Sequence, residues 1–397
     1  LVADWMVEKA LSEGREVVFT APIKALSNQK FRDYCGLFGE DKVGLVTGDL
    51  VIRRDAPCRV MTTEILRNIL LLGEELPNLA AVIIDEIHFL DDHERGTTWE
   101  ELLIYLDPSV QVVGLSATLA NQDEFAHWLE TVRGRPVRVI EEHTRAVPLS
   151  FCVASKEGGL KSPDEMRTYH KGWKRKHGQA LAQMHKGQRG GGRRGRNRGR
   201  GQGGGGKGRG GGRERAGSPT RHYDIFWMLW PDYAPYLYFV FSRRDAEGMA
   251  RGLANRLRRV EPDADGQTGL LKAEEKEKVR LRLRQFRIDG GVSALDQDLA
   301  AMYMMGIAFH HAGLHVSLKA LVEELYESRL IKVLYCTGTF ALGINMPARS
   351  AVFDGLMRYD GKGMIQLPTR EFMQMAGRAG RRGMDTSGTV VVRSSVG

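Results

Sequence analysis

Short, fully apolar runs alternate with stretches of helical periodicity, and this alternation restricts the fold more than any other feature of the sequence. Apolar runs at 16–20, 79–84 and 111–115 have the length and β-rich composition of strands, and helical patterns at 63–72 and 123–132 lie between them. A strand that is apolar on both faces must be covered on both, as in a parallel sheet with helices on each side. The chain is therefore predicted to be α/β.

The rhythm stops near Phe151 and resumes at the apolar run 237–241, so we predict two lobes. At 397 residues the chain is too long for one ordinary core. We assign residues 1–150 to a first lobe, 151–230 to a linker and insertion, and 231–397 to a second lobe.

The insertion contains an unusual stretch, residues 187–217, with 16 glycines among arginines and almost nothing apolar. Such a stretch cannot bury enough surface to offset its ordering entropy, so we expect it to be disordered. Residues 166–213 carry 15 Lys and Arg and no acidic residue, whereas the whole chain has a net charge of +9. The remainder is therefore mildly acidic, at about −6, and the basic segment predicts a polyanionic partner.

Cysteine spacing and hydropathy exclude several classes of protein. The four cysteines are scattered without a CxxC pair, which argues against a disulfide framework or a zinc site. His310 and His311 are adjacent, but no further ligands have metal-site spacing, so a structural role is favoured. No apolar run reaches membrane-spanning length and no signal peptide is visible. We expect a soluble protein in the cytoplasm, with the nucleus as the open alternative.

The segment AVIIDEIH, residues 81–88, delivers two adjacent carboxylates, Asp85 and Glu86, at the end of an apolar strand. In open parallel sheets, ligands bind at that edge. An aspartate there can hold Mg²⁺ against nucleotide phosphates, and a neighbouring glutamate can orient or deprotonate a water molecule. From these residues alone, the alternative is a strand that ends in a charged turn.

The segment QMAGRAGRRG, residues 374–383, places Arg378 and Arg381 three residues apart, on one face if the segment is helical. Guanidinium groups can clamp a transferring phosphoryl group. The glycines within this segment are costly in a helix interior, which suggests that something approaches the backbone closely. The alternative is a solvated basic helix end.

Small polar or basic residues also follow other predicted strands, where phosphates are often bound. They are Lys24, Thr63, Ser116 and Thr118 in the first lobe, and Arg243, Thr337, Gly343 and Asn345 in the second. Taken singly, each can equally be a helix cap or a strand end.

Seven segments, in one order, give the chain a family resemblance. They are APIKALSNQK, MTTEILRN, DEIHFLDDHERGTTWEE, LSATLAN, FHHAGL, TFALGINMPA and QMAGRAGRRG. In this order they resemble the superfamily-two DExH-box helicases, and most closely the Ski-type (superkiller-type) RNA helicases, over nearly the whole chain except about 152–230. The resemblance implies two RecA-like parallel-sheet lobes with the Gly/Arg-rich insertion between them.

The resemblance also implies the cofactors ATP and Mg²⁺ and a role for each candidate residue. Asp85 would bind the metal, Glu86 would activate water, and Arg378 and Arg381 would act as arginine fingers. His88, Gly343, Asn345 and Gln374 would serve the nucleotide site, Ser116 and Thr118 would couple the lobes, and Lys24, Thr63, Thr337 and, from its strand-end position, Arg243 would contact nucleic acid.

The implied activity is ATP-driven 3′ to 5′ movement on single-stranded RNA in RNA processing or decay, with an RNA-degrading nuclease as a partner. Two alternatives stay open, namely a DNA helicase in repair and a non-catalytic RNA-binding scaffold. The Gly/Arg-rich stretch resembles RGG-type RNA-binding segments, and its alternative is a flexible linker.

One family feature does not occur in this sequence, because no phosphate loop of GxGKT type is present. In relatives that loop directly precedes the helix that corresponds here to residues 1–11. We therefore expect the loop to lie immediately before Leu1 in a longer protein. This chain by itself is expected to bind ATP poorly.

Overall fold

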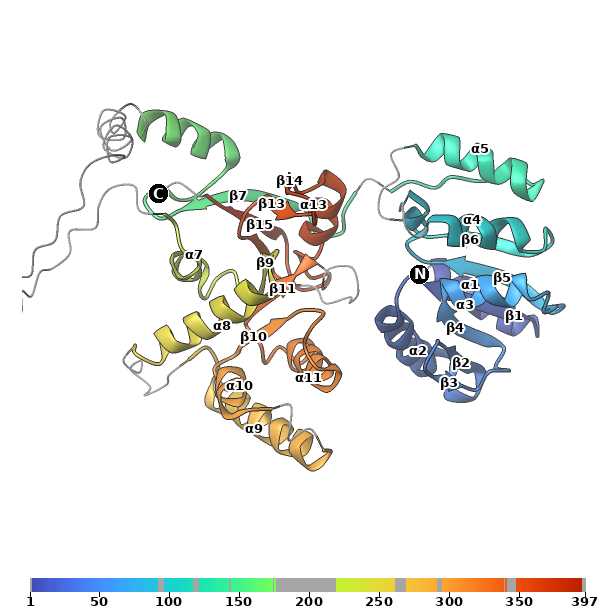
Figure 1. Ribbon diagram of the computed structural model, residues 1–397, viewed down its shortest axis with the longest axis horizontal. Helices are drawn as coiled ribbons and strands as arrows, with labels where there is room; N and C mark the ends of the chain where they lie inside the picture. Colours follow the sequence, from blue (N-terminus) through green and yellow to red (C-terminus); the bar gives the residue numbers. More distant parts are fainter. Residues whose placement is uncertain are drawn as a thin grey trace, which may run out of the picture. The chain divides into compact units, whose positions relative to one another are not determined.

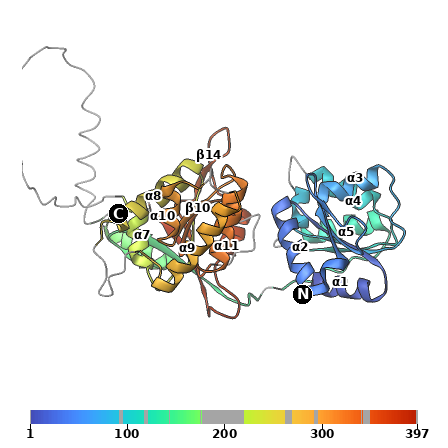
Figure 2. The same cartoon turned by 90° about the horizontal axis from the view of Figure 1, so that it is seen from below.

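The computed structural model describes residues 2–91, 96–116, 121–142, 144–173, 175, 219–260, 269–290, 295–338, 340 and 348–394. The chain divides into two compact units, Leu1–Arg145 with Phe340–Asn345, and Ala146–Thr339 with Met346–Gly397 (Figures 1 and 2). Each unit is built around its own sheet.

The first unit contains a six-stranded sheet in the order β3-β2-β4-β1-β5-β6, parallel except for the pairing of β3 with β2. Its strands are β1 Glu16–Ala21, β2 Val43–Val46, β3 Val51–Ile52, β4 Cys58–Thr62, β5 Leu79–Ile84 and β6 Gln111–Gly114. Its helices are α1 Val2–Ser12, α2 Lys24–Phe38, α3 Thr63–Leu71, α4 Gly96–Tyr105 and α5 Gln122–Arg133, with short 3₁₀ turns η1 Glu40–Lys42 and η2 Ile87–Asp91.

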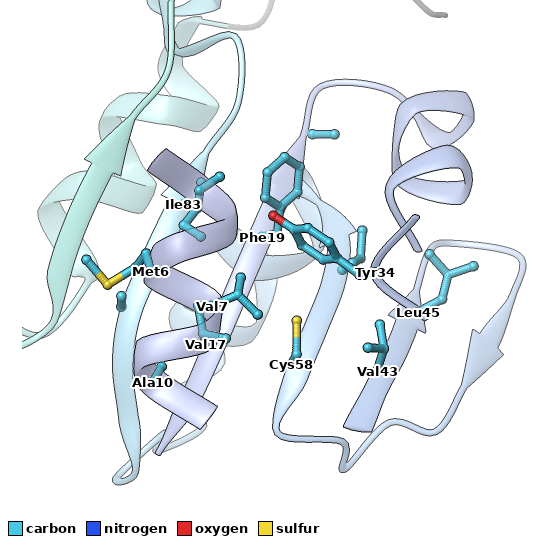
Figure 3. Close-up of a cluster of buried hydrophobic side chains, with 14 residues drawn as sticks. Met6, Val7, Ala10, Val17, Phe19, Tyr34, Val43, Leu45, Cys58 and Ile83 are labelled. Carbon is cyan, nitrogen blue, oxygen red and sulfur yellow. The ribbon is translucent and has the colours of Figure 1, made fainter. Parts of the chain in front are cut away.

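Both faces of this sheet are buried, which explains why β5 is apolar at every position and β1 is apolar at residues 17–19. Successive side chains of a strand point to opposite faces. In β1, Phe19 enters the core beneath α1 and α2, where its ring meets that of Tyr34 edge-on at 5.7 Å (Figure 3). The neighbouring Val18 enters the other core, which contains Trp99 of α4 and Leu66 of α3.

The second unit contains a seven-stranded sheet in the order β10-β11-β9-β12-β15-β7-β8, parallel except for β8. Its strands are β7 Leu149–Ser155, β8 Gly159–Lys161, β9 Tyr236–Val240, β10 Ile307–His310, β11 Val333–Thr337, β12 Ser350–Phe353 and β15 Gly388–Arg393, and β13 Met357–Tyr359 and β14 Met364–Gln366 form a separate hairpin. Its helices are α7 His222–Leu229, α8 Arg243–Leu257, α9 Ala273–Ile288, α10 Gln297–Tyr303, α11 Val316–Glu327 and α13 Thr369–Ala376.

These two largely parallel sheets confirm the predicted α/β class and are consistent with two RecA-like lobes. Part of the stretch assigned to the linker nevertheless belongs to the second unit, because β7 pairs with β15 and β8 pairs with β7. The first residues of β7 are exposed or half-buried, so this strand lacks the fully apolar signature that reveals the central strands. The expectation of disorder for 187–217 falls outside the described residues.

A partly buried polar network holds Thr220, which lies just before α7, against the sheet of the second unit. The Arg393 guanidinium donates to the Thr220 carbonyl at 2.8 Å and, through Nε and Nη2, to both carboxylate oxygens of Asp354 at 2.7 and 2.8 Å. The Tyr238 hydroxyl donates to the same carboxylate at 2.8 Å. This charge-assisted network fixes the start of α7 relative to three strands of the sheet.

None of the described helices is long and apolar enough to cross a membrane. All four cysteines are free thiols, and Cys58 and Cys336 are fully buried. Burial raises the pKa of the Cys58 thiol to about 12, so it remains protonated at neutral pH.

The backbone at the start of β15 yields a stability prediction. A Cβ on Gly388 would lie 2.5 Å from the backbone nitrogen of Gly380 and 2.7 Å from the carbonyl oxygen of Ala379. Gly388→Ala should therefore destabilise the second unit by about 2–3 kcal/mol, measured by thermal unfolding. Gly172→Ala is the control, because its Cβ would meet nothing within 4 Å. Equal melting temperatures for the two variants would contradict the prediction.

Candidate functional site

The acidic box begins where the carboxyl ends of β1, β5 and β6 meet at one edge of the first sheet. Parallel pairing sets Thr20 beside Ile84, and Ile84 beside Gly114. The Asp85 N–H donates to the Thr20 carbonyl, and the Leu115 N–H donates to the Ile84 carbonyl, each at 2.9 Å. The backbone of Asp85 thus continues the sheet at the edge where open parallel sheets bind ligands.

Glu86 turns the chain sharply after the strand. Its φ is +52°, a left-handed conformation that costs a non-glycine residue about 1–3 kcal/mol and collects at functional sites. Two hydrogen bonds hold the turn. The Glu86 N–H donates to Asp85 Oδ1 at 3.0 Å, and the Ile87 N–H donates to the Leu115 carbonyl at 2.9 Å. The surrounding sheet therefore maintains a conformation that the local sequence does not favour.

His88 lies beneath this turn and contacts the Glu86 carboxylate. Its side chain is 4% exposed, and Nδ1 lies 3.1 Å from Glu86 Oε2 and 3.5 Å from Ser116 Oγ. The imidazole stacks on Phe89 with ring centroids 5.2 Å apart, and Phe89 stacks on Trp99 at 5.7 Å. His88 therefore orients Glu86 and links it to the segment after β6. Thr118, the other predicted coupling residue, lies outside the described residues.

The first-unit residues predicted to contact nucleic acid differ in exposure. Lys24 opens α2 and is exposed, with Nζ 3.0 Å from Asp49 Oδ1. Hydrogen bonds from Lys24 and Thr47 lower the pKa of the Asp49 carboxyl. Thr63 opens α3 but is fully buried, and its hydroxyl has no hydrogen-bond partner in the part of the chain that the structure describes. Lys24 is therefore accessible to a ligand, and the Thr63 side chain is enclosed.

In the second unit, Arg243 and Thr337 both lie at the carboxyl edge of the sheet. Thr337 ends β11 and is paired with Val240, the last residue of β9, after which Arg243 begins α8. Arg243 is exposed, and its guanidinium approaches Gly313, where a Cβ would lie 3.2 Å from Nη1. Gly343 and Asn345 lie outside the described residues.

The segment 374–383 is helical only as far as Ala376, where α13 ends. Arg378 and Arg381 therefore do not share a helix face. The backbone here pairs with Ala348 instead, because the Ala348 N–H donates to the Arg378 carbonyl at 2.9 Å and the Gly380 N–H donates to the Ala348 carbonyl at 2.8 Å. Gly380 has φ +87°, which a glycine adopts without strain and a helix excludes.

The close approach suggested by these glycines is found at Gly380. A Cβ there would lie 2.6 Å from the Val147 side chain and 3.2 Å from Gly388 Cα. The neighbour is thus the protein's own backbone at the start of β15, so this glycine serves chain packing.

Arg381 has a partner that the sequence analysis missed, Asp385. The Arg381 backbone N–H and Nε donate to Asp385 Oδ2 at 2.9 and 2.8 Å, and Nη2 donates to Oδ1 at 2.8 Å. The carboxylate is 6% exposed. Arg381 holds the pKa of Asp385 below its ordinary value, and Asp385 raises the pKa of Arg381. In the sequence, the signal that could indicate this pair is the spacing of four residues between Arg381 and Asp385.

Gln374, on the last turn of α13, carries a buried amide nitrogen, Nε2, without a hydrogen-bond partner among the residues described. A buried donor of this kind is rare and calls for an acceptor. Phosphate oxygens are acceptors, so the predicted contact of Gln374 with a nucleotide fits this geometry.

His310 and His311 are buried, and each faces a carboxylate. His310 Nε2 lies 2.9 Å from Glu323 Oε1, and His311 Nε2 lies 3.0 Å from Glu247 Oε1. Within the described ranges, no group of three or more His, Cys, Asp and Glu side chains could hold a metal ion. These contacts connect α11 to His310 of β10, and α8 to His311, the residue after it.

A chain with two largely parallel sheets, the first ending in an acidic pair on a strained turn, falls in the class of RecA-like, two-unit proteins. The family model described as DEAD/DEAH box helicase matches residues 3–125. Curated relatives match over nearly all of the chain. The chloroplastic DExH-box ATP-dependent RNA helicase DExH15 of Arabidopsis thaliana is 35% identical over 429 residues, covering 100% of this chain and 34% of the relative.

Two further relatives agree. Superkiller complex protein 2 of Homo sapiens is 36% identical over 414 residues (99% of this chain, 30% of the relative), and probable helicase HelY of Mycobacterium tuberculosis is 36% identical over 419 residues (99% and 42%). Over nearly its whole length the chain is therefore similar to DExH-box helicases of the superkiller type, and its residues 3–125 match the DEAD/DEAH box helicase model. It spans between about a third and two-fifths of the length of these relatives.

The Arg381–Asp385 pair yields a pH prediction. Asp385→Asn should lower the free energy of unfolding at pH 7 by about 2–4 kcal/mol, because it leaves a half-buried guanidinium without its counter-charge. Because the pKa of the Asp385 carboxyl is lower in the folded state than its ordinary value of 3.8, the ionised carboxylate stabilises the folded state at pH values above 3.8. This stabilisation is lost as pH falls through the lower folded-state pKa. The difference in the free energy of unfolding between wild type and variant, measured by denaturant unfolding, should therefore disappear below about pH 4.

The exposed carboxylate variant Asp232→Asn is the matched control and should leave stability nearly unchanged at every pH. A gap for Asp385→Asn that persists undiminished at acid pH would contradict the assigned role of the pair.

Proposed function

We propose that this chain is the motor of an ATP-dependent RNA helicase that moves 3′ to 5′ on single-stranded RNA in RNA processing or decay. The observation that carries the proposal is the strained Glu86 turn, which holds Asp85 and Glu86 at the ligand-binding edge of a parallel sheet. The named RNA helicases among the relatives support RNA as the substrate. The direction and an RNA-degrading nuclease as partner rest on the family resemblance.

The residues present fit ATP with Mg²⁺. Mg²⁺ in nucleotide sites keeps several waters and takes one or two carboxylates together with phosphates, so Asp85 suffices on the protein side. ATP supplies the phosphoanhydride that is hydrolysed. Glu86, oriented by His88 at 3.1 Å, would accept a proton from the attacking water. Gln374 would supply its unpartnered amide donor to a phosphate.

The remaining roles are proposed on the family pattern. Arg378 and Arg381 would bind phosphate, and Arg381 must exchange its Asp385 contact to do so. Lys24, Arg243 and Thr337 would contact the nucleic-acid backbone from the carboxyl edges of their own sheets, with Thr63, Ser116, Thr118, Gly343 and Asn345 in their family roles. The Gly/Arg-rich stretch 187–217 would be an auxiliary RNA contact.

Two other functions remain to be separated from this one, a DNA helicase in repair and a non-catalytic RNA-binding scaffold. For the full-length protein, we expect ATP hydrolysis to be stimulated several-fold by single-stranded RNA and much less by single-stranded DNA of the same sequence. Steady-state ATPase assays with both polymers measure this. Equal stimulation would remove the preference for RNA, and no hydrolysis with either would favour the scaffold.

Glu86→Gln tests the proposed base. The substitution keeps the size of the side chain and removes its basicity, so hydrolysis by the full-length protein should fall by about 10²- to 10⁴-fold while ATP and RNA still bind. Pre-steady-state phosphate release measures the rate. The exposed residue Glu75 offers a matched control, because Glu75→Gln makes the same chemical change away from the sheet edge. Turnover retained by Glu86→Gln would take this residue out of catalysis.

A further inference from the structure

A cavity of about 490 Å³ opens between the start of α7 and the last turns of α8. The two helices lie side by side in both ribbon views (Figures 1 and 2). At 1.5 Å per residue, the cavity lies about 13–20 Å along α8 from Arg243, away from the carboxyl edge of the sheet. No residue of the candidate site lines it. Its lining comprises His222, Tyr223, Gly252, Asn255, Arg256, Arg259 and Val260.

His222 presents a neutral donor to this cavity. Burial lowers the pKa of its imidazole to about 4, so it is uncharged at neutral pH. Its Nδ1 lies 2.9 Å from the Tyr335 hydroxyl, which burial keeps protonated. No other acceptor for that hydroxyl is seen in the described part of the chain, so we assign its proton to the bond with Nδ1, which leaves the hydrogen of His222 on Nε2.

The position of Gly252 leaves Nε2 of His222 accessible. A Cβ on Gly252 would lie only 3.8 Å from this nitrogen and from Cε1, so a glycine on α8 keeps the space in front of the ring clear. The second ring contact of His222 is Tyr223, whose ring meets it edge-on at 5.3 Å. The cavity floor is therefore an aromatic surface with one N–H donor.

The other polar groups of the cavity are also donors. The Arg256 guanidinium carbon lies 4.2 Å from the Tyr223 ring centroid, a cation–π contact, and the guanidinium N–H groups have no hydrogen-bond partner among the described residues. Arg259 is exposed nearby. The side-chain oxygen Oδ1 of Asn255 accepts from Arg258 Nη1 at 3.5 Å, so the side-chain nitrogen Nδ2 can donate. The lining has no carboxylate, and neither Arg256 nor Arg259 has an ion pair among the described residues.

The cavity combines hydrogen-bond donors with aromatic and aliphatic side chains. It therefore suits a ligand that has both a flat ring and an anionic group whose oxygens only accept hydrogen bonds. We propose that this cavity binds a phosphorylated nucleotide unit, with its phosphate on Arg256 and Arg259 and its base against His222 and Val260. The volume is that of a small-molecule site. Guanidinium and aromatic planes beside each other are the usual platform for a base in single strands. An acidic peptide offers the anion without the ring, and is therefore less well matched.

The ligand can be a free mononucleotide or one nucleotide of a single-stranded RNA, and two probes separate these sources. We expect uridine 5′-monophosphate to shift the His222 Cε1–H resonance saturably, in the full chain and without ATP hydrolysis. Octauridylate that competes for this signal at roughly tenfold lower concentration would identify RNA as the source. Because the readout belongs to His222, it is independent of the proposed ATPase and of nucleotide bound elsewhere.

Matched variants test whether the cavity itself binds. Arg256→Gln with Arg259→Gln should weaken binding of uridine 5′-monophosphate by about tenfold or more, because two charge-assisted contacts are lost. Arg284→Gln with Arg287→Gln removes the same charge from exposed positions on α9, outside the lining, and should change binding less than about twofold. Gly252→Leu should abolish the shift with both arginines in place.

Several results would overturn the proposal. They are the absence of a saturable shift, equal losses in the two arginine pairs, unchanged binding in Gly252→Leu, and a shift produced by a tetraglutamate peptide but not by uridine 5′-monophosphate. Binding that appears only after Glu261→Gln, Asp263→Asn and Asp265→Asn would do the same, because it would assign the arginines to the chain's own acidic segment after Val260.

Discussion

The backbone N–H of Asp85 donates to the carbonyl of Thr20, one residue past the point where β5 ends. This hydrogen bond extends the parallel pairing of β1 with β5 into the acidic box, so the position of the carboxylates is set by the sheet. The sheet in turn is set by burial on both faces, which requires apolar side chains along most of β1 and all of β5. The acidic pair follows directly where β5 ends, and the carboxyl ends of the parallel strands lie at the same edge of the sheet.

That arrangement also explains how Glu86 can remain in a left-handed conformation. A backbone conformation that costs about 1–3 kcal/mol persists only where the surrounding contacts outweigh that cost. Here the contacts are the hydrogen bond from Ile87 to Leu115 on the neighbouring strand end and the carboxylate contact with buried His88. The same histidine faces Ser116, so the direction of the Glu86 side chain depends on the segment after β6. A change in the position of Ser116 would therefore be transmitted to the Glu86 carboxylate through the buried His88 ring.

The parts of this structure that the sequence predicts are those fixed by local pattern. The run 79–84 coincides with β5, and the pattern at 63–72 differs from α3 by one residue at its end, because fully apolar strands and amphipathic helices carry their own signatures. The sequence pattern does not reveal the strand β7, because this strand is partly exposed and its position depends on its pairing with β15. The left-handed turn at Glu86 has no such signature, since nothing in the residues DEIH favours a positive φ.

The segment after α13 shows why a correct motif gave a wrong local structure. Its glycine spacing indicates close backbone approach, which is found, but the approaching backbone is that of Gly388 and Ala348 and it breaks the helix. The Arg381 guanidinium donates two hydrogen bonds to the carboxylate of Asp385. A phosphate carries more charge than this carboxylate and more acceptor oxygens, so it can compete for the same guanidinium. Asp385 thus holds Arg381 in a defined orientation, and the phosphate contact proposed for Arg381 would require this pair to be exchanged.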